Sequence, residues 1–266
     1  MSMATSWKAL QRIKATKFLA IILLACAHVG LEAQDSRPPL TAAEVVNRMV
    51  AMSASRNDAL RSYSSLRSYT IDFNGIKRLH AEMVVSMNYR YPNKKDLTIV
   101  SESGSGTLRQ RVLHPLLAAE LEAMEPDNQR QSAISPDNYS FELVGYTQTD
   151  AGGYYVLEVR PRHKNKFLFK GRIWVDAKGF AVTRVLGEPA VNPSWWTKKT
   201  DFERAYKQVD RFWLPAWNQS LTHVRIFGQA QLTIEYGNYH LRETRGSEPI
   251  PAVESSLAIP SAPQQP

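Results

Sequence analysis

An alternating pattern runs through Leu79-His80-Ala81-Glu82-Met83-Val84-Val85-Ser86-Met87-Asn88-Tyr89. Apolar side chains occupy the odd positions, and mostly polar side chains occupy the even positions. Because successive side chains of a strand point to opposite faces of its sheet, this pattern predicts a long antiparallel strand with one buried face. Pro92-Asn93 ends the strand, since proline cannot donate a hydrogen bond to a neighbouring strand.

The second half of the chain repeats this kind of pattern in further segments. Turn residues separate several of them, at 150–153, 176–179 and 227–228. Connections this short join neighbouring antiparallel strands, so the segments are expected to form a meander. Another strand is predicted around residues 96–101. The predicted strands of the second half are 139–147, 154–160, 167–176, 180–186, 201–209, 213–224 and 229–241.

Two segments have helical patterning instead. Thr41-Ala42-Ala43-Glu44 has the form of a capping box, and the apolar residues that follow predict a helix ending between residues 56 and 60, before a change to the strand period from Leu66. Residues 107–124 predict a second helix that Pro115 breaks or kinks, with a flexible break before it at 103–106 and a mobile loop after it at 125–137.

A long meander with one apolar face has to cover that face, and the two helices are available to do so. The fold class predicted for residues 40–245 is therefore mainly β (α+β). It is a curved antiparallel sheet that forms an unclosed β-barrel with amphipathic helices on the concave face.

The N-terminus predicts export. A basic region ending at Lys17 meets the apolar stretch 18–27, which matches a signal peptide and is short for a membrane span; an N-terminal anchor helix is the alternative. Cleavage after Ala33 makes residues 1–33 the signal peptide and 34–39 a linker. Residues 246–266 are rich in Pro, Ser and Ala and are expected to form a disordered tail.

The only cysteine of the chain, Cys26, lies in Leu23-Leu24-Ala25-Cys26, which resembles the lipobox of bacterial lipoproteins. Cleavage before Cys26 would leave an acylated, membrane-anchored lipoprotein, whereas cleavage after Ala33 would leave a periplasmic protein. In both cases the mature chain has no second thiol, so disulfides are excluded.

The net charge of +8 falls when the basic signal region is removed. The remaining surface is mildly basic, which suits anionic lipid head groups or simple solubility, and no run of Lys and Arg is dense enough to indicate nucleic acid. No catalytic or phosphate-binding motif occurs, and the histidines are not spaced as metal ligands. We therefore expect no enzyme, no metal and no cofactor, with a hydrolase of dispersed site as the weakest alternative.

Three further features invite a functional interpretation. The rows of Met and Leu can line an acyl-chain pocket or form an ordinary core. Trp195 and Trp196 can meet a membrane interface or a partner, or close one end of the barrel. The basic segment 160–166, with Arg162, Lys164 and Lys166, can meet acidic head groups or be a solvated turn.

A family resemblance follows from three runs: Tyr154-Tyr155-Val156-Leu157-Glu158-Val159-Arg160-Pro161, Gly171-Arg172-Ile173-Trp174-Val175-Asp176 and Phe180-Ala181-Val182-Thr183-Arg184-Val185. They resemble the central strands of the LolA/LolB-like outer-membrane lipoprotein carrier and sorting proteins. The resemblance implies an unclosed barrel with helices as a lid over an apolar cavity, and binding instead of catalysis. Arg67 and Arg78 are the two candidates for that family's gating arginine.

The predicted function is thus non-catalytic binding of lipid or lipoprotein acyl chains in the periplasm by a monomer. The alternative is an envelope interaction, scaffold or stress-sensing protein whose own side chains fill the interior. The residues predicted to line the cavity are Leu79, Met83, Val85, Met87, Leu157, Val159, Ile173, Val175, Leu232 and Ile234. The residues predicted to form the helical lid are Val45, Met49, Met52, Leu113 and Leu117.

Overall fold

The computed structural model describes residues 40–192, 197–225 and 228–243. The predicted signal peptide, linker and tail, together with Cys26, Trp195 and Trp196, lie outside these residues. All ten strands belong to one antiparallel sheet. The strands are β1 (Leu60–Asn74), β2 (Arg78–Arg90), β3 (Lys94–Gly104), β4 (Tyr139–Thr149), β5 (Gly152–Pro161), β6 (Phe169–Asp176), β7 (Val182–Pro189), β8 (Thr197–Val209), β9 (Phe212–Val224) and β10 (Gln229–Glu243).

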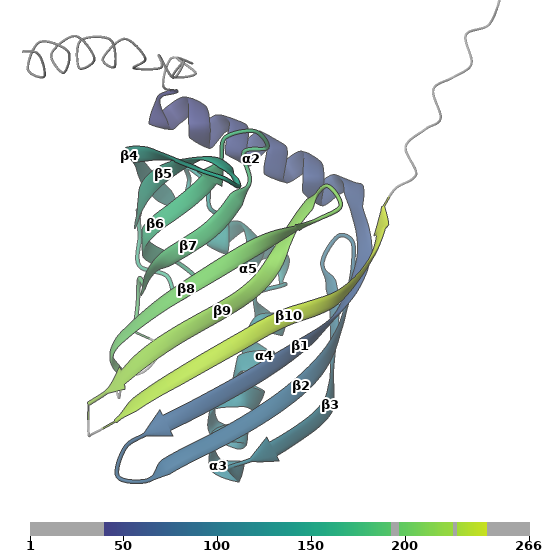
Figure 1. Cartoon of the computed structure of the whole chain (residues 1–266), viewed down its shortest axis with the longest axis vertical. Helices are drawn as coiled ribbons and strands as arrows, with labels where there is room; N and C mark the ends of the chain where they lie inside the picture. Colours follow the sequence, from purple (N-terminus) through teal and green to yellow (C-terminus); the bar gives the residue numbers. More distant parts are fainter. Residues whose placement is uncertain (1–39, 193–196, 226–227, 244–266) are drawn as a thin grey trace, which may run out of the picture. The chain divides into compact units, whose positions relative to one another are not determined.

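The order across the sheet is β3-β2-β1-β10-β9-β8-β7-β6-β5-β4, and β3 and β4 form its two edges (Figure 1). Strands consecutive in the chain are neighbours throughout each half, as the short turns predict. The two halves meet where β1 pairs with β10, for example Tyr69 with Ile234. Because the edge strands do not pair with each other, the barrel stays open, and the predicted fold class is confirmed.

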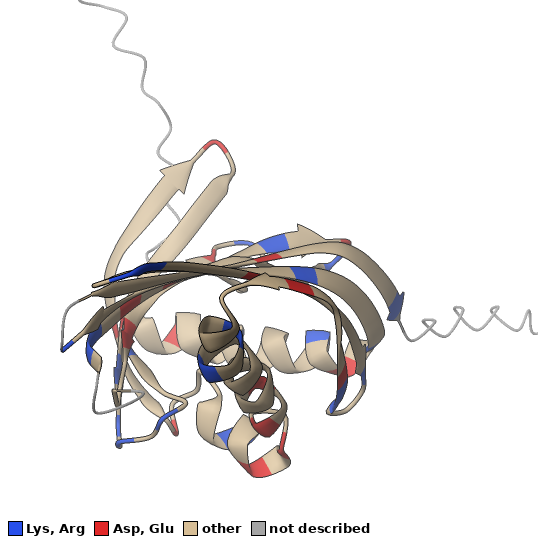
Figure 2. Ribbon diagram, turned by 90° about the horizontal axis from the view of Figure 1, so that it is seen from below, with Lys and Arg blue, Asp and Glu red and all other residues tan. Residues whose placement is uncertain are grey.

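The helices lie in the hollow of the arched sheet (Figure 2). Helix α2 (Ala42–Ala59) begins with the predicted capping box, in which the Glu44 amide donates to the Thr41 hydroxyl and the Thr41 amide donates to the Glu44 carboxylate. Strand β1 follows α2 directly at Leu60, earlier than the predicted change of period at Leu66. Residues 61–65 carry one Arg, three Ser and one Tyr, so they show no apolar alternation that could predict a strand.

The predicted helix 107–124 is divided into three parts: α3 (Gly106–Leu108), a π-helical turn η1 (Arg109–Leu113) and α4 (His114–Glu122). Proline has no amide hydrogen and clashes with the carbonyl four residues before it in a continuous α-helix. The turn before Pro115 widens accordingly, with the His114 amide donating to the Arg109 carbonyl five residues earlier. Pro115 then lies in the first turn of α4, where a missing amide costs nothing.

Two predictions of irregular structure are wrong. The predicted loop 125–137 contains helix α5 (Pro126–Ser132), which starts at a proline. The predicted flexible break 103–106 is an ordered junction, because Gly104 ends β3 and the Ser105 side chain caps α3. Gly104 has φ +78°, and a Cβ there would lie 2.4 Å from the His80 carbonyl oxygen, so this junction needs a glycine.

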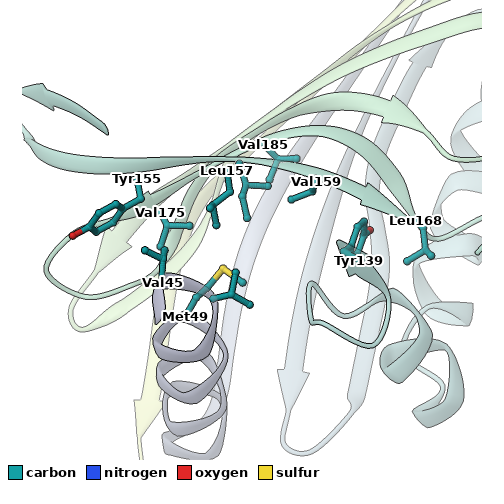
Figure 3. Close-up of a cluster of buried hydrophobic side chains, with 11 residues drawn as sticks. Val45, Met49, Tyr139, Tyr155, Leu157, Val159, Leu168, Val175 and Val185 are labelled. Carbon is teal, nitrogen blue, oxygen red and sulfur yellow. The ribbon is translucent and has the colours of Figure 1, made fainter. Parts of the chain in front are cut away.

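Each half of the concave face has its own hydrophobic core. In one half, Val45 and Met49 of α2 point toward Leu157 and Val175 of the sheet (Figure 3). In the other, Leu113 and Leu117 pack against a cluster that includes Met83. A third, smaller cluster consists of Leu60, Phe212 and Leu214. The interior is therefore not one continuous core, and the space between these three clusters is a candidate binding site.

Candidate functional site

A cavity of about 790 Å³ lies between the second half of α2, the segment around α5, and the sheet. This volume is within the range of small-molecule sites. The apolar part of its lining includes the third cluster together with residues of α2 and of the segment from α4 to β4. These apolar lining residues include Met49, Val50, Leu60, Met124, Ile134, Phe180, Val182, Phe212, Leu214 and Pro215.

Helix α2 changes its role along its length. Its first half is anchored, since Val45 and Met49 are no more than 3% exposed. The face that carries Met49 continues through Ser53 and Arg56, which line the cavity, and few side chains of this second half are buried. The prediction for Met52 has to be corrected, because it is 42% exposed and does not line the cavity.

The ten residues predicted to line a cavity lie on the concave face or beside it, but none of them lines the observed cavity. Leu79 and Leu232 are half-buried and pack against the core of α3 and α4. The other eight residues are at most 4% exposed; they are Met83, Val85, Met87, Leu157, Val159, Ile173, Val175 and Ile234. The lid residues Leu113 and Leu117 pack in the same core as Met83 and Val85. A ligand reaches these positions only if the helices move.

Four tyrosines that were not predicted as site residues also line the cavity: Tyr63, Tyr89, Tyr91 and Tyr206. Tyr63, Tyr89 and Lys95 form one cross-strand row over β1, β2 and β3, because Tyr63 pairs with Tyr89 and Tyr89 pairs with Lys95. The ring centroids of Tyr63 and Tyr89 lie 5.3 Å apart. The alternation of β2 contains the signal for Tyr89, at the end of the odd row that begins at Leu79.

A buried ion network ties α4 to the sheet. Glu120 of α4 accepts from the Arg67 guanidinium of β1 and, at 2.9 Å, from the Lys95 ammonium of β3. Arg67 is 3% exposed, and its guanidinium lies 5.1 Å from the Tyr236 ring centroid. Of the two candidate gating arginines, Arg67 thus contacts a helix, whereas Arg78 is exposed at the start of β2. Removing α4 from the sheet requires this network to break.

Burial and charge shift the pKa values of the groups in and beside this network. Burial opposes ionisation of Glu120, but the charges of Lys95 and Arg67 and their hydrogen bonds outweigh burial and lower the pKa of this carboxyl. Burial raises the pKa of Tyr63 to about 12, so its hydroxyl keeps its proton at physiological pH. The cavity wall therefore presents stable hydroxyl groups beside cations.

We expect this network to make stability depend on pH in the acid range. The pKa of Glu120 is lower in the folded state than its unfolded value of about 4.3. Its contribution to the free energy of unfolding is therefore complete above the unfolded pKa and is lost as pH falls through the lowered folded pKa. Chemical denaturation between pH 3 and 6 should show this loss. In Glu120→Gln, the free energy of unfolding should depend less on pH over this range. An unchanged profile in Glu120→Gln would contradict the assignment.

The predicted surface contacts divide into two kinds. Arg162 donates to the carbonyl oxygens of Pro136 at 2.7 Å and Tyr139 at 3.1 Å, and Lys166 pairs with Glu122 at 2.6 Å. Both therefore hold the β5–β6 connection against the segment that precedes β4. Lys164 is exposed and makes no ion pair with any residue that the structure describes.

The described residues contain neither a candidate metal site nor a candidate membrane-spanning helix. Within these residues, no three His, Cys, Asp or Glu side chains gather in a way that could hold a metal ion. No helix in the same part of the chain is long and apolar enough to cross a membrane.

No family model and no curated protein matches the chain. Among solved structures, it is similar to an outer-membrane lipoprotein-sorting protein domain from Vibrio parahaemolyticus, at 11% identity and TM-score 0.40, covering 76% of this chain and 93% of that one. It is also similar to a LolA superfamily protein from Nitrosomonas europaea, at 12% identity and TM-score 0.32, covering 77% and 96%. A third match is the MucA/MucB complex of Pseudomonas aeruginosa, at 11% identity and TM-score 0.25, covering 74% and 94%. These are distant likenesses of fold, and the open ten-stranded sheet described above stands on its own geometry.

Proposed function

We propose that this protein is a non-catalytic binding protein of the bacterial cell envelope that holds the acyl chain of a lipid or lipoprotein between its sheet and its helices. The observation that carries the proposal is the cavity of about 790 Å³, which lies against the concave face and has a mostly apolar wall. The resemblance of residues 154–185 to lipoprotein carriers agrees with this use. We place the mature protein in the periplasm or, if Cys26 is acylated, on a membrane.

The lining suits a hydrocarbon chain. Met49, Val50, Leu60, Phe212 and Leu214 offer apolar surface to it. Burying a methylene group is worth about 0.8 kcal/mol, so a chain of ordinary length gains enough free energy to be held without any covalent step. Methionine adds an adaptable surface at the helix, which suits ligands of varied shape.

The helices give the site a way to open. The first half of α2 is anchored in a core, whereas residues 50–58 have no buried side chain. This part of the helix can move away from the cavity at small cost in buried surface once the hydrogen bonds of Arg56 to Gly179 and Phe180 break. Helix α4 is held by the Glu120 network, whose rupture would uncover the row that contains Met83, Val85 and Met87. In this proposal the cavity admits the ligand first, and the larger apolar face receives it when α4 moves.

A pair of substitutions in α2 tests the proposal. Val50 lines the cavity and is 36% exposed, so Val50→Trp fills cavity space without entering the core. We expect it to weaken uptake of a neutral apolar dye, N-phenyl-1-naphthylamine, about tenfold or more, because the indole occupies the volume that the ligand needs. Fluorescence titration measures the affinity, and native mass spectrometry of protein purified without detergent detects a bound lipid mass.

Met52→Trp is the matched control, since Met52 lies on the same helix, is 42% exposed and does not line the cavity. Its affinity should equal that of the wild type. Equal affinities for all three proteins would contradict the cavity as the binding site. A clean unliganded mass together with no dye binding would reject lipid binding and favour the alternative, an envelope interaction protein with a filled interior.

A further inference from the structure

The buried ion network carries more positive than negative charge. Glu120 is the only carboxylate that accepts from Arg67 and Lys95 among the described residues, and both cations share its Oε1 atom. The Arg67 side chain is 4% exposed and the Lys95 side chain 12% exposed, so water screens neither of them well. The Arg67 Nε atom is buried without a hydrogen-bond partner. A buried excess of positive charge is costly unless an anion joins it.

Besides Lys95, Arg56 is a second cation in the lining of the cavity. Arg56 of α2 donates to the carbonyl oxygens of Gly179 at 2.7 Å and Phe180 at 3.3 Å, and no described carboxylate forms an ion pair with it. Burial lowers the pKa of Arg56, and the charge of Asp176 offsets this only in part. The Asp176 carboxylate accepts from the Lys178 and Gly179 amides and does not line the cavity.

The rest of the polar lining can donate hydrogen bonds and carries no negative charge. No Asp or Glu is among the described residues that line the cavity. The hydroxyls of Tyr63 and Tyr206 have no hydrogen-bond partner in the described part of the chain, and Tyr63 belongs to the same cross-strand row as Lys95. Lys95 and Tyr63 thus place a cation and a free hydroxyl on one wall of a cavity whose lining is mostly apolar.

We propose that the ligand of this cavity is a single-chain amphiphile with an anionic head, a long-chain fatty acid, whose carboxylate is held by Lys95 and the Tyr63 hydroxyl. This inference rests on the proposed function and names its ligand class. The carboxylate supplies the charge that the network lacks, and the chain occupies the apolar wall around Leu60 and Leu214. A single chain suits a volume in the range of small-molecule sites better than a lipid with several chains.

The test compares two ligands that differ only in the head group. Dodecanoic acid and 1-dodecanol are each titrated at neutral pH against the full mature protein with bound N-phenyl-1-naphthylamine, and displacement of the dye gives their affinities. We expect the acid to bind about tenfold or more tightly than the alcohol, since a charge-assisted hydrogen bond replaces a neutral one. We expect Lys95→Gln to remove most of that preference, with a larger loss of affinity for the acid than for the alcohol.

Lys94→Gln is the matched control, because Lys94 is the exposed neighbour of Lys95 on β3 and does not line the cavity. It should keep the preference for the acid. Equal affinity for acid and alcohol, or a preference that survives in Lys95→Gln, would overturn the fatty-acid inference and leave the proposed function standing. Failure of both ligands to displace the dye, or of the dye to bind, would overturn the two together.

Discussion

Replacing Glu120 with alanine is expected to lower the free energy of unfolding by about 3 kcal/mol. The variant leaves the guanidinium of Arg67, which is 3% exposed, without its carboxylate partner, and it also frees the largely buried ammonium of Lys95. An uncompensated buried charge costs more than the lost ion pair itself contributes, because the charge keeps its desolvation penalty. Urea denaturation followed by circular dichroism measures the change.

The control lies on the same helix. Glu122 pairs with Lys166 on the surface, with side chains 48% and 61% exposed, so Glu122→Ala should change stability by less than about 1 kcal/mol. The triple variant Arg67→Met, Lys95→Met, Glu120→Met should recover most of the stability lost in Glu120→Ala, since it removes all three charges of the network together. Equal losses in Glu120→Ala and Glu122→Ala would show that the network does not hold α4.

Replacing Gly171 with alanine is expected to destabilise the protein by about 3 kcal/mol or more. Gly171 of β6 pairs with Gly187 of β7 and has φ +152°, which an alanine rarely adopts. A Cβ at Gly171 would lie 2.1 Å from the Leu186 carbonyl oxygen and 2.6 Å from the Gly187 Cα. These are backbone atoms, so the pairing of the two strands has to shift, and thermal unfolding reports the cost.

Gly237 of β10 is the matched control, since it is also a strand glycine but a Cβ there would meet nothing within 4 Å. Gly237→Ala should stay within about 1 kcal/mol of the wild type. If Gly171→Ala were equally mild, the close approach of β6 and β7 would not be a requirement of the fold.

The sequence predicts the sheet well where one face is buried. The odd row of β2 includes Met83, Val85 and Met87, all no more than 1% exposed, because a strand with a single covered face must alternate. The cap at Thr41 is predicted for a similarly local reason, since its hydrogen bonds join residues three apart. The pairing of β1 with β10 is not local, and nothing in either strand alone identifies its partner.

The predicted site is less well placed than the fold. In β1, Leu66 is 39% exposed and Arg67 faces the interior, the reverse of what hydropathy favours. This register depends on Glu120 and Lys95, which come from α4 and β3 and cannot be assigned to Arg67 from the sequence of β1. A row of apolar side chains that points inward is expected both for an interior filled by side chains and for an interior with an open cavity. The position of the cavity depends on where α2 extends beyond the core that contains Val45 and Met49, and only the three-dimensional arrangement determines this.

The pairing of β1 with β10 has a consequence for how the chain folds. These strands lie far apart in the described part of the chain, with Leu60 beside Glu243. Contacts of such high contact order form late, because the loop between the partners must first be closed. The hairpin of β1 and β2 with β3, and the meander from β4 to β9, can each begin to assemble alone. The junction between them forms only after β10 has been synthesised, so the ten-stranded sheet is completed only when translation has passed this strand.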